Sequence, residues 1–181
     1  MQGLLKEFDE LPIESLYWNP FTRVGNGWML ITAGDRKANN TMTAQWGLFG
    51  VLWRKYMFQI YIRPQRYTKK FVDQNELITL SFFEEKYRDA LKICGTRSGR
   101  EGNKWEMSGL HPHYIDGTTA VEEARLVIIG RKQYSQWINP DLFTEKENDT
   151  RCYPQKDYHE AYTFEIIKVL HRGFDKGNID F

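Results

Sequence analysis

Long apolar runs, rich in β-branched and aromatic residues, constrain the fold of this 181-residue chain more than any other feature. Runs of this composition, bounded by turn residues, are typical of buried strands. They occupy residues 28–35, 55–63, 77–83, 119–138 and 158–172. The run over 119–138 is compatible with one long strand or with two strands broken near Gly130. Runs this long and this numerous favour a mainly β domain.

Two helices are predicted between these strands. Thr68 is a suitable N-cap for a helix over residues 69–75. Residues 84–94 have helical spacing, and Gly95 is a natural stop for that helix. The face of this second helix that would turn inward carries Tyr87, Leu91 and Cys94.

The rest of the chain adds one short helix and several loops. Residues 102–110 predict the short helix, whereas the polar stretches 36–44 and 139–157 predict loops. No repeat or linker divides the chain, so residues 1–181 are expected to form a single domain. A β-barrel with a few short inserted helices fits this order better than a regularly alternating βαβ sheet.

The charge balance limits the partners that the protein can attract. The formal net charge is +1, from 25 basic and 24 acidic residues. No overall field draws in nucleic acid or anionic lipid, so an anion must be held by local donors. Aromatic residues make up 15% of the chain, which argues for packed flat surfaces or a planar ligand.

The remaining composition favours a cytoplasmic protein without a metal. Cys94 and Cys152 have no CxxC neighbour, so we expect two reduced, unpaired thiols, with a single disulfide as the alternative. His111 and His113 have no further ligand at metal-binding spacing. Residues 1–18 lack the apolar core of a secretion signal, and no apolar run is long enough to span a membrane.

The first of three polar segments follows the predicted strand over 28–35. Asn39, Asn40, Thr41 and Thr43 offer amides and hydroxyls, and a loop of this kind can present its backbone to the edge of a heteroaromatic ring. Trp46 could lie against the face of such a ring. The alternative is a polar hairpin connection with a core tryptophan.

The second polar segment, YIRPQRYT, follows an apolar strand. Arg63 and Arg66 match phosphate oxygens bidentately, and Thr68 adds a hydroxyl at a predicted helix N-terminus. Pro64 fixes the backbone at the strand exit. The segment therefore predicts a phosphate site, with a solvated basic turn paired to a surface carboxylate as the alternative.

The third polar segment is CGTRSGREGNK, after the predicted helix over 84–94. Small residues, including Ser98 and Gly99, surround several cations, among them Lys104. The segment lacks the GxxxxGK[ST] pattern of a P-loop. It is either a second anion-binding loop or a connection that stops a helix.

Three motifs in this order resemble the flavin reductase-like, flavoredoxin-type family of FMN-binding split barrels. They are NNTMTAQWGLFGVLW, YIRPQRYT and SFFEEKYRDALKICGTRSGRE followed by a lysine, and the resemblance extends over about residues 15–172. It implies a homodimeric split β-barrel with FMN bound at the subunit interface.

Carried over by position, the resemblance implies three groups of FMN-binding residues. Those facing the isoalloxazine ring and ribityl chain would be Asn40, Thr41, Met42, Thr43 and Ala44. Those holding the ribityl and phosphate end would be Arg63, Gln65, Arg66, Tyr67 and Thr68. Ser98, Gly99 and Lys104 would complete the phosphate cradle.

Two positions depart from the family pattern. Tyr56 takes the place of a proline and could crowd or line the site. The usual Gly-Asp-His segment is matched only by Asp157 and His159, with Phe164 where a glycine is common. His159 is therefore a hypothetical catalytic residue beside the nicotinamide, and a partly exposed strand histidine is the alternative.

Three functions remain open at this point. The first is an NAD(P)H-dependent flavin reductase that passes reduced FMN to a partner. The second is an electron carrier that keeps FMN bound and exchanges electrons with a redox partner protein. In both, the flavin performs the redox chemistry and the protein binds and orients it. The third, a single-strand nucleic-acid module, is disfavoured by the balanced charge. A flavin-free structural barrel is disfavoured to a similar degree.

Overall fold

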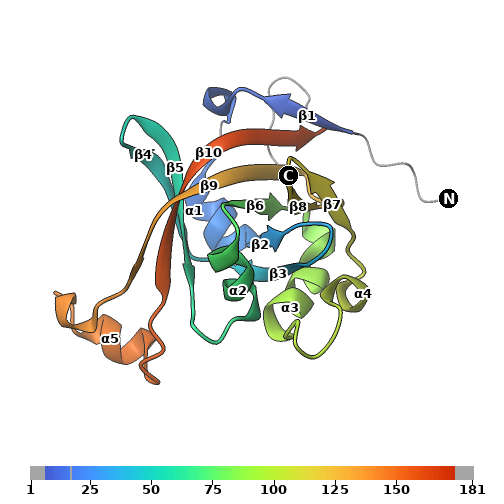
Figure 1. The fold of residues 1–181 in the computed structure, drawn as a ribbon. Coiled ribbons are helices and arrows are strands. Elements are labelled where there is room, and N and C mark those ends of the chain that lie inside the picture. The colour runs from blue at the N-terminus through green and yellow to red at the C-terminus, as the bar shows by residue number, and fades with distance from the viewer. Residues whose placement is uncertain (1–6, 17, 174–181) are drawn as a thin grey trace.

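The computed structural model describes residues 7–16 and 18–173, and these residues form a curled antiparallel sheet with short helices packed around it (Figure 1). The ten strands are β1 (Phe8–Leu11), β2 (Met29–Gly34), β3 (Asn39–Ala44), β4 (Gly47–Leu52), β5 (Lys55–Ile62), β6 (Leu77–Phe82), β7 (Pro112–Ile115), β8 (Thr118–Val121), β9 (Leu126–Trp137) and β10 (Glu160–Arg172). The helices are α1 (Pro20–Thr22), α2 (Tyr67–Gln74), α3 (Arg88–Thr96), α4 (Lys104–Ser108) and α5 (Glu147–Cys152). Shorter turns are η1 (Ile13–Ser15), η2 (Arg23–Gly27), η3 (Glu85–Tyr87) and η4 (Pro140–Leu142).

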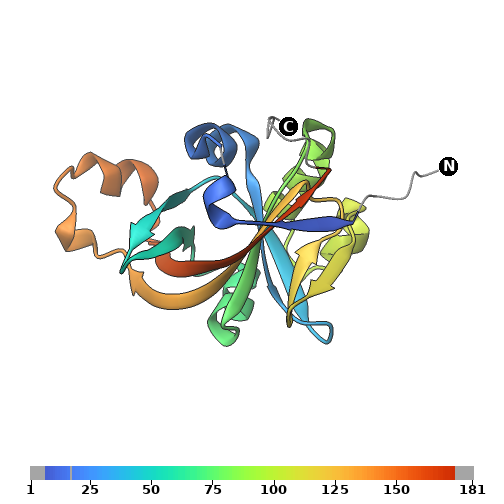
Figure 2. The ribbon, with the colours of Figure 1, turned by 90° about the horizontal axis from the view of Figure 1, so that it is seen from above.

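The main sheet is held together by its last strand. Its order is β3-β2-β6-β9-β10-β5-β4, and β7 and β8 form a separate hairpin. The first half of β10 pairs with β5, from Glu160 opposite Ile62, and the second half pairs with β1. Along its other edge β10 pairs with β9, with register shifts at Thr163/Phe164 and Ile166/Lys168. Such irregularities increase twist, and the curled sheet is visible in Figure 2.

The two faces of this sheet bury two different cores. Ile31, Phe58 and Phe164 belong to the core inside the curl, where the two phenylalanine rings stack with centroids 5.1 Å apart. Leu30 and Leu91 belong to a second core, between the outer face of the sheet and α3, α4 and β8. Neighbouring residues such as Leu30 and Ile31 enter different cores because side chains alternate along a strand. Burial on both faces explains why the strands read as continuous apolar runs.

Of the two alternatives for residues 119–138, one long strand or two strands broken near Gly130, neither is correct as stated. The interruption lies between β8 and β9, and β9 continues through Gly130. A Cβ atom at this position would lie 2.4 Å from ring atoms of Phe58. Gly130 is therefore required by the close packing of the inner core and not by a strand end.

The polar stretch 36–44 is also not the loop that its composition predicts. Residues Asn39–Ala44 form β3, which pairs with β2 along its whole length. Its buried hydroxyls find partners inside the sheet, since Thr32 Oγ1 donates to Thr41 Oγ1 at 2.9 Å. Satisfied side chains allow a sequence with loop composition to form a buried strand.

Helix boundaries differ from the predictions at two positions. The helix after β5 begins at Tyr67 with Arg66 as its N-cap residue, so Thr68 lies inside α2 and is buried. Helix α3 continues past Gly95 to Thr96. A Cβ atom on Gly95 would lie 3.3 Å from Thr43 Cβ, so this glycine permits close contact between α3 and β3. The short helix predicted over 102–110 is confirmed as α4.

Residues 138–159, which we call the arm, connect β9 to β10 and extend away from the barrel (Figures 1 and 2). The predicted loop over 139–157 lies here, but it contains η4 and α5. Across residues 7–16 and 18–173, no helix is both long enough and apolar enough to span a membrane. Residues 1–6 of the N-terminal stretch, where we predicted no secretion signal, lie outside the described residues.

Candidate functional site

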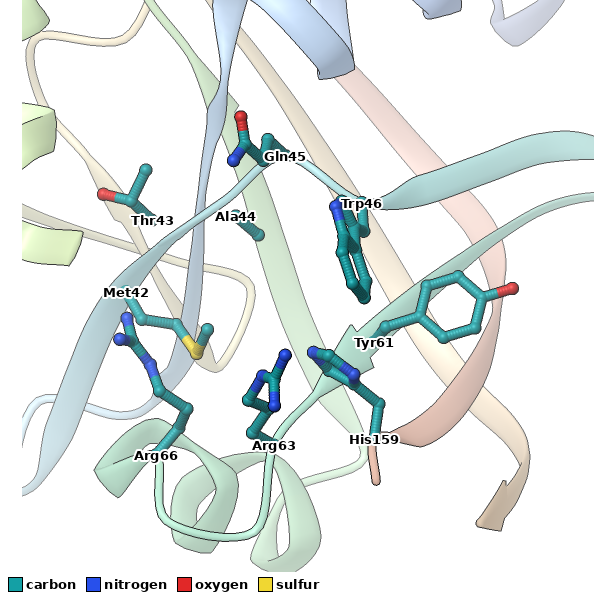
Figure 3. Close-up of a pocket in the computed structure, with 9 residues that line it drawn as sticks. All are labelled: Met42, Thr43, Ala44, Gln45, Trp46, Tyr61, Arg63, Arg66 and His159. Carbon is teal, nitrogen blue, oxygen red and sulfur yellow. The ribbon is translucent and has the colours of Figure 1, made fainter. Parts of the chain in front are cut away.

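The ends of three strands and the start of one helix enclose a cavity of about 200 Å³, which we call the basic cavity (Figure 3). Its lining residues are Met42, Thr43, Ala44, Gln45, Trp46, Tyr61, Arg63, Arg66 and His159. They come from β3 and the connection to β4, from β5 and the turn before α2, and from the residue that precedes β10. Segments far apart in the sequence meet here because β10 and β5 are paired and β3 lies across the opening.

Seven of the predicted site residues line this cavity. They are Met42, Thr43, Ala44, Trp46, Arg63, Arg66 and His159. Trp46 is 42% exposed, so the alternative of a core tryptophan is wrong. Gln45 and Tyr61 were not predicted, although both lie inside the quoted motifs, Gln45 between Ala44 and Trp46 and Tyr61 at the start of YIRPQRYT. Contiguity with the motif residues was the available signal.

The other predicted residues lie outside the lining of the basic cavity. They are Asn40, Thr41, Gln65, Tyr67, Thr68, Ser98, Gly99 and Lys104. Several of them pack behind it: Asn40 Nδ2 donates to Thr68 Oγ1 at 2.8 Å, and a Cβ atom on Gly99 would lie 2.3 Å from Asn40 Oδ1. Gln65 is exposed and donates to Asp157.

Tyr56, which departs from the family pattern, does not line the basic cavity. It lies in the β4–β5 hairpin opposite Val51 and is 41% exposed. In the single chain, Tyr56 therefore neither crowds nor lines the basic cavity or the larger one that adjoins it.

Arg63 is fully engaged by the arm. Its Nη1 forms an ion pair with Asp157 Oδ1 at 2.5 Å, and its Nη2 donates to the Cys152 carbonyl at 2.9 Å. The guanidinium also lies over the ring of Tyr153, 5.3 Å from the centroid. Hydrogen bonds from Gln65 and Arg63 lower the pKa of Asp157. Arg63 therefore matches the alternative of an arginine paired to a carboxylate.

Arg66 is in the opposite situation. Its Nη1 donates to the Gly95 carbonyl at 2.8 Å, while its buried Nη2 has no hydrogen-bond partner among the described residues. Burial lowers the pKa of Arg66. A buried guanidinium nitrogen without a partner is unfavourable, and an anion would satisfy it.

Lys104 is a second buried cation close to Arg66. Its ammonium donates to the carbonyls of Thr41 and Cys94, each at 2.8 Å, and the residue is 5% exposed. Burial, with a smaller contribution from Arg66, lowers the pKa of Lys104 to about 8. Within the described part of the chain, neither cation forms an ion pair, and the attraction of Glu101 only partly offsets the effect of burial on the pKa of Lys104.

His159 forms the wall nearest the arm. Its ring lies 4.8 Å from Trp46, between centroids, and its Nδ1 lies 2.9 Å from the Tyr153 hydroxyl. Burial and the positive charge of Arg63 lower the pKa of His159 to about 4. The imidazole is therefore neutral at physiological pH. The residue is buried, with 7% exposure, and precedes β10, so it is not the partly exposed strand histidine of the alternative prediction.

A larger cavity of about 460 Å³, which we call the neutral cavity, adjoins the first and shares Gln45, Trp46 and Tyr61 with it. Its other lining residues are Pro20, Phe21, Val24, Gly25, Gly47, Leu48, Phe49, Ile138 and Tyr153. None of these side chains is charged. The two cavities together run from a cationic end to an uncharged, aromatic end.

Both cysteines are free thiols, as predicted. No group of three or more histidine, cysteine or acidic side chains within residues 7–16 and 18–173 is arranged to hold a metal ion.

Comparison with known proteins gives one family match. The model of the flavin reductase like domain matches residues 21–134, which is more than half of the chain. A search of curated proteins found no match.

Solved structures share the fold across most of the chain. An FMN-binding domain of a flavin reductases-like enzyme from Shewanella baltica superposes with a TM-score of 0.70 and 13% identity, over 97% of this chain and 83% of the other. Flavoredoxin from Methanosarcina acetivorans gives 0.65 and 17%, over 85% and 74%. A Shewanella frigidimarina protein with a split barrel domain gives 0.62 and 16%, over 94% of both chains. These likenesses confirm the predicted mainly β, split-barrel fold.

Proposed function

The chain belongs to the flavin reductase-like domain family, and we propose that it is an FMN-binding oxidoreductase that accepts electrons from NADH or NADPH. The family membership supports oxidoreductase chemistry. The nicotinamide donor follows from the predicted flavin reductase activity.

The observation that carries the proposal is the pair of buried cations that lack an ion-pair partner among the described residues. Arg66 lines the basic cavity at one end, with Lys104 buried close to it outside the lining, and the aromatic lining of the neutral cavity lies at the other end. FMN has the same polarity, with a phosphate dianion at one end and an uncharged tricyclic ring at the other. Sites for ligands of this size measure roughly 300–1,000 Å³. FMN would therefore extend from the basic cavity into the neutral one.

Residues of this chain would bind FMN and exclude water. Arg66 and Lys104 would neutralise the phosphate, since charge-assisted hydrogen bonds are the strongest available to it. Trp46 and Tyr61 would cover the ring, and Met42, Thr43, Ala44 and Gln45 would border it. When bound, the flavin supplies the hydride and electron chemistry, which no side chain here provides. The assignments of Arg63 and of the residues packed behind the cavity stay predictions.

A second function is an electron carrier that holds FMN without turning over NAD(P)H. The structural likeness to a flavoredoxin favours it. The two functions differ in how tightly flavin is held, since a carrier must retain FMN through many redox cycles.

We also propose a homodimer. A band of exposed apolar side chains follows the β4–β5 hairpin and the outer half of β9: Leu48, Val51, Leu52, Trp53, Tyr56, Tyr134 and Trp137. Apolar patches of this kind on a soluble protein mark interaction surfaces. A second copy of the chain covering this band would shield it from water. A redox partner protein and a cytoplasmic location are part of the same proposal, the latter supported by two free thiols.

An absorbance spectrum of the purified protein, with and without added FMN, tests the proposal. Flavin bands that survive dialysis support the carrier, whereas colourless protein that oxidises NADH in the presence of FMN supports the reductase. The proposal fails if the protein neither binds FMN nor oxidises NADH or NADPH with it. Sedimentation or light scattering measures the dimer independently.

A further inference from the structure

Tyr153 lies on the arm, immediately behind His159, and nothing in the family motifs points to it. Its hydroxyl lies 2.9 Å from His159 Nδ1, and the two rings meet edge to face with centroids 5.5 Å apart. Both residues are buried, at 3% and 7% exposure. The arm lies beyond residues 21–134, to which the family model is matched. Tyr153 is therefore a feature of this chain that the shared motifs do not explain.

The direction of the hydrogen bond between these residues follows from their other partners. A buried hydroxyl must donate its proton to an acceptor, because an unsatisfied buried donor is costly. Among the described residues, the acceptor within reach of the Tyr153 hydroxyl is His159 Nδ1. If Nδ1 carried the proton instead, the hydroxyl would be left as a donor without an acceptor. The satisfied arrangement has the hydroxyl donating to an unprotonated Nδ1.

Neutral imidazole carries one proton, which must then reside on Nε2. His159 lines the basic cavity, beside Trp46 and Arg63 (Figure 3). The ring thus has one nitrogen tied to the arm and its other nitrogen available to whatever occupies the cavity. The partner that would accept from Nε2–H is a carbonyl oxygen or an unprotonated ring nitrogen.

The position of Tyr153 is fixed from several sides. Its ring packs against Tyr158, 4.9 Å away, and against Phe143, 6.1 Å away. The Arg63 guanidinium lies over it and is itself tied to Asp157 and Cys152. Contacts from both ends of the arm hold the Tyr153 hydroxyl in place. A hydrogen bond can fix the position of a proton on a neighbouring group only when its donor is held in this way.

We propose that Tyr153 is a positioning residue that holds His159 in the Nε2–H tautomer, so that His159 donates a hydrogen bond to an acceptor atom of the bound flavin or of the second substrate. The identity of that ligand rests on the proposed function. The tautomer itself does not, because it is a property of the protein without ligand.

Nitrogen NMR of the protein without ligand tests the tautomer directly. Long-range ¹H–¹⁵N spectra at neutral pH distinguish a protonated Nε2 from a protonated Nδ1. We expect a protonated Nε2 in the wild type and a mixture of both tautomers in Tyr153→Phe. Tyr158→Phe is the matched control, because that hydroxyl donates to Asp149 and should leave the His159 signals unchanged. A protonated Nδ1 in the wild type, or an unchanged tautomer in Tyr153→Phe, would overturn the proposal.

Binding and turnover identify the ligand that receives the hydrogen bond. Loss of one such bond predicts a change of about 2- to 12-fold. If the flavin accepts the hydrogen bond, Tyr153→Phe should raise the Kd for FMN by this factor. If the second substrate accepts it, Tyr153→Phe should raise the KM for NADH instead. His159→Gln, which can place an amide N–H near the position of Nε2, should retain more activity than His159→Asn. Unaltered Kd and KM in Tyr153→Phe would contradict the donor role.

These experiments separate the two proposals. If the protein binds no FMN and oxidises no NAD(P)H, the proposed function fails, while the nitrogen spectra still decide whether Tyr153 sets the tautomer. If flavin binds and the tautomer is the Nδ1–H form, the positioning role fails alone.

Discussion

Arg63 and Arg66 lie in the same turn but on different sides of the basic cavity. The two sides differ in whether the arginine has an ion-pair partner. On the arm side, Arg63 is paired with Asp157 and with a backbone carbonyl. On the helix side, Arg66 and Lys104 bond only to carbonyl oxygens, and Arg66 Nη2 has no partner within the described chain. One side is complete without a ligand, and the other is incomplete. The sequence predicts the same phosphate-binding role for both arginines, whereas their partners in the fold differ.

The largest effect should come from removing the ligand's charge. Riboflavin, which lacks the phosphate, leaves Arg66 and Lys104 uncompensated, and two hydrogen bonds to charged groups contribute about 3 kcal/mol or more. We expect riboflavin to bind more weakly than FMN by at least this amount in titrations at fixed salt. Equal affinities would show that the helix side does not bind phosphate.

The next effect concerns Lys104 in the protein without ligand. Its folded pKa of about 8 lies below the ordinary value of 10.5. Between these values the unfolded chain binds the proton more tightly, so the free energy of unfolding should rise with pH, by at most about 3 kcal/mol. The measurement is the difference in denaturant stability between wild type and Lys104→Met from pH 7 to 10, in which the other titrating groups cancel. Parallel curves would mean that the charge of Lys104 is already compensated.

Arg66→Ala addresses the comparison between the two arginines. We expect it to weaken FMN binding by roughly 1.5–3 kcal/mol, the contribution of a hydrogen bond to a charged group. Arg63→Ala is the matched control and should weaken FMN binding less, since its guanidinium is held by Asp157. Fluorescence titration with FMN measures both. A larger loss in Arg63→Ala than in Arg66→Ala would reverse the assignment of the two sides.

The smallest effect should come from Asp157→Asn. The ion pair with Arg63 is partly exposed, so its loss should lower the free energy of unfolding by about 1 kcal/mol or less. FMN affinity should not fall, because Arg63 remains available to the cavity. If FMN affinity falls as far as in Arg66→Ala, the arm side is part of the binding site and not only its support.

Most of the barrel could be predicted from the sequence, because its strands are buried on both faces and read as long apolar runs. Strand β3 was missed for a physical reason. Asn40 and Thr41 have loop composition, and the partners of their side chains include Thr68 and Thr32, which lie elsewhere in the chain. Gly95 was interpreted as a helix stop and Gly130 as one possible strand break. Both glycines instead permit close packing against another element, which the local sequence does not indicate.

The site was predictable where its residues are contiguous and not where they meet through the fold. The motifs indicated Arg63 and Arg66, but the carboxylate that pairs with Arg63 lies in the arm, far along the chain. Tyr153 also lies in the arm, and its proposed role depends on the contact that the folded arm makes with His159. Pairing partners of this kind decide which charges remain for a ligand.

Strand β10 joins β1, β5 and β9, segments from the beginning, middle and end of the described chain. During synthesis, the edges of these strands that pair with β10 remain unpaired until residues 160–172 leave the ribosome. Contacts so distant in sequence form slowly, and unpaired edges are prone to associate with other chains. The yield of folded protein during expression should therefore depend on the amount of chaperone in the cell. A chain that ends before β10 should be insoluble.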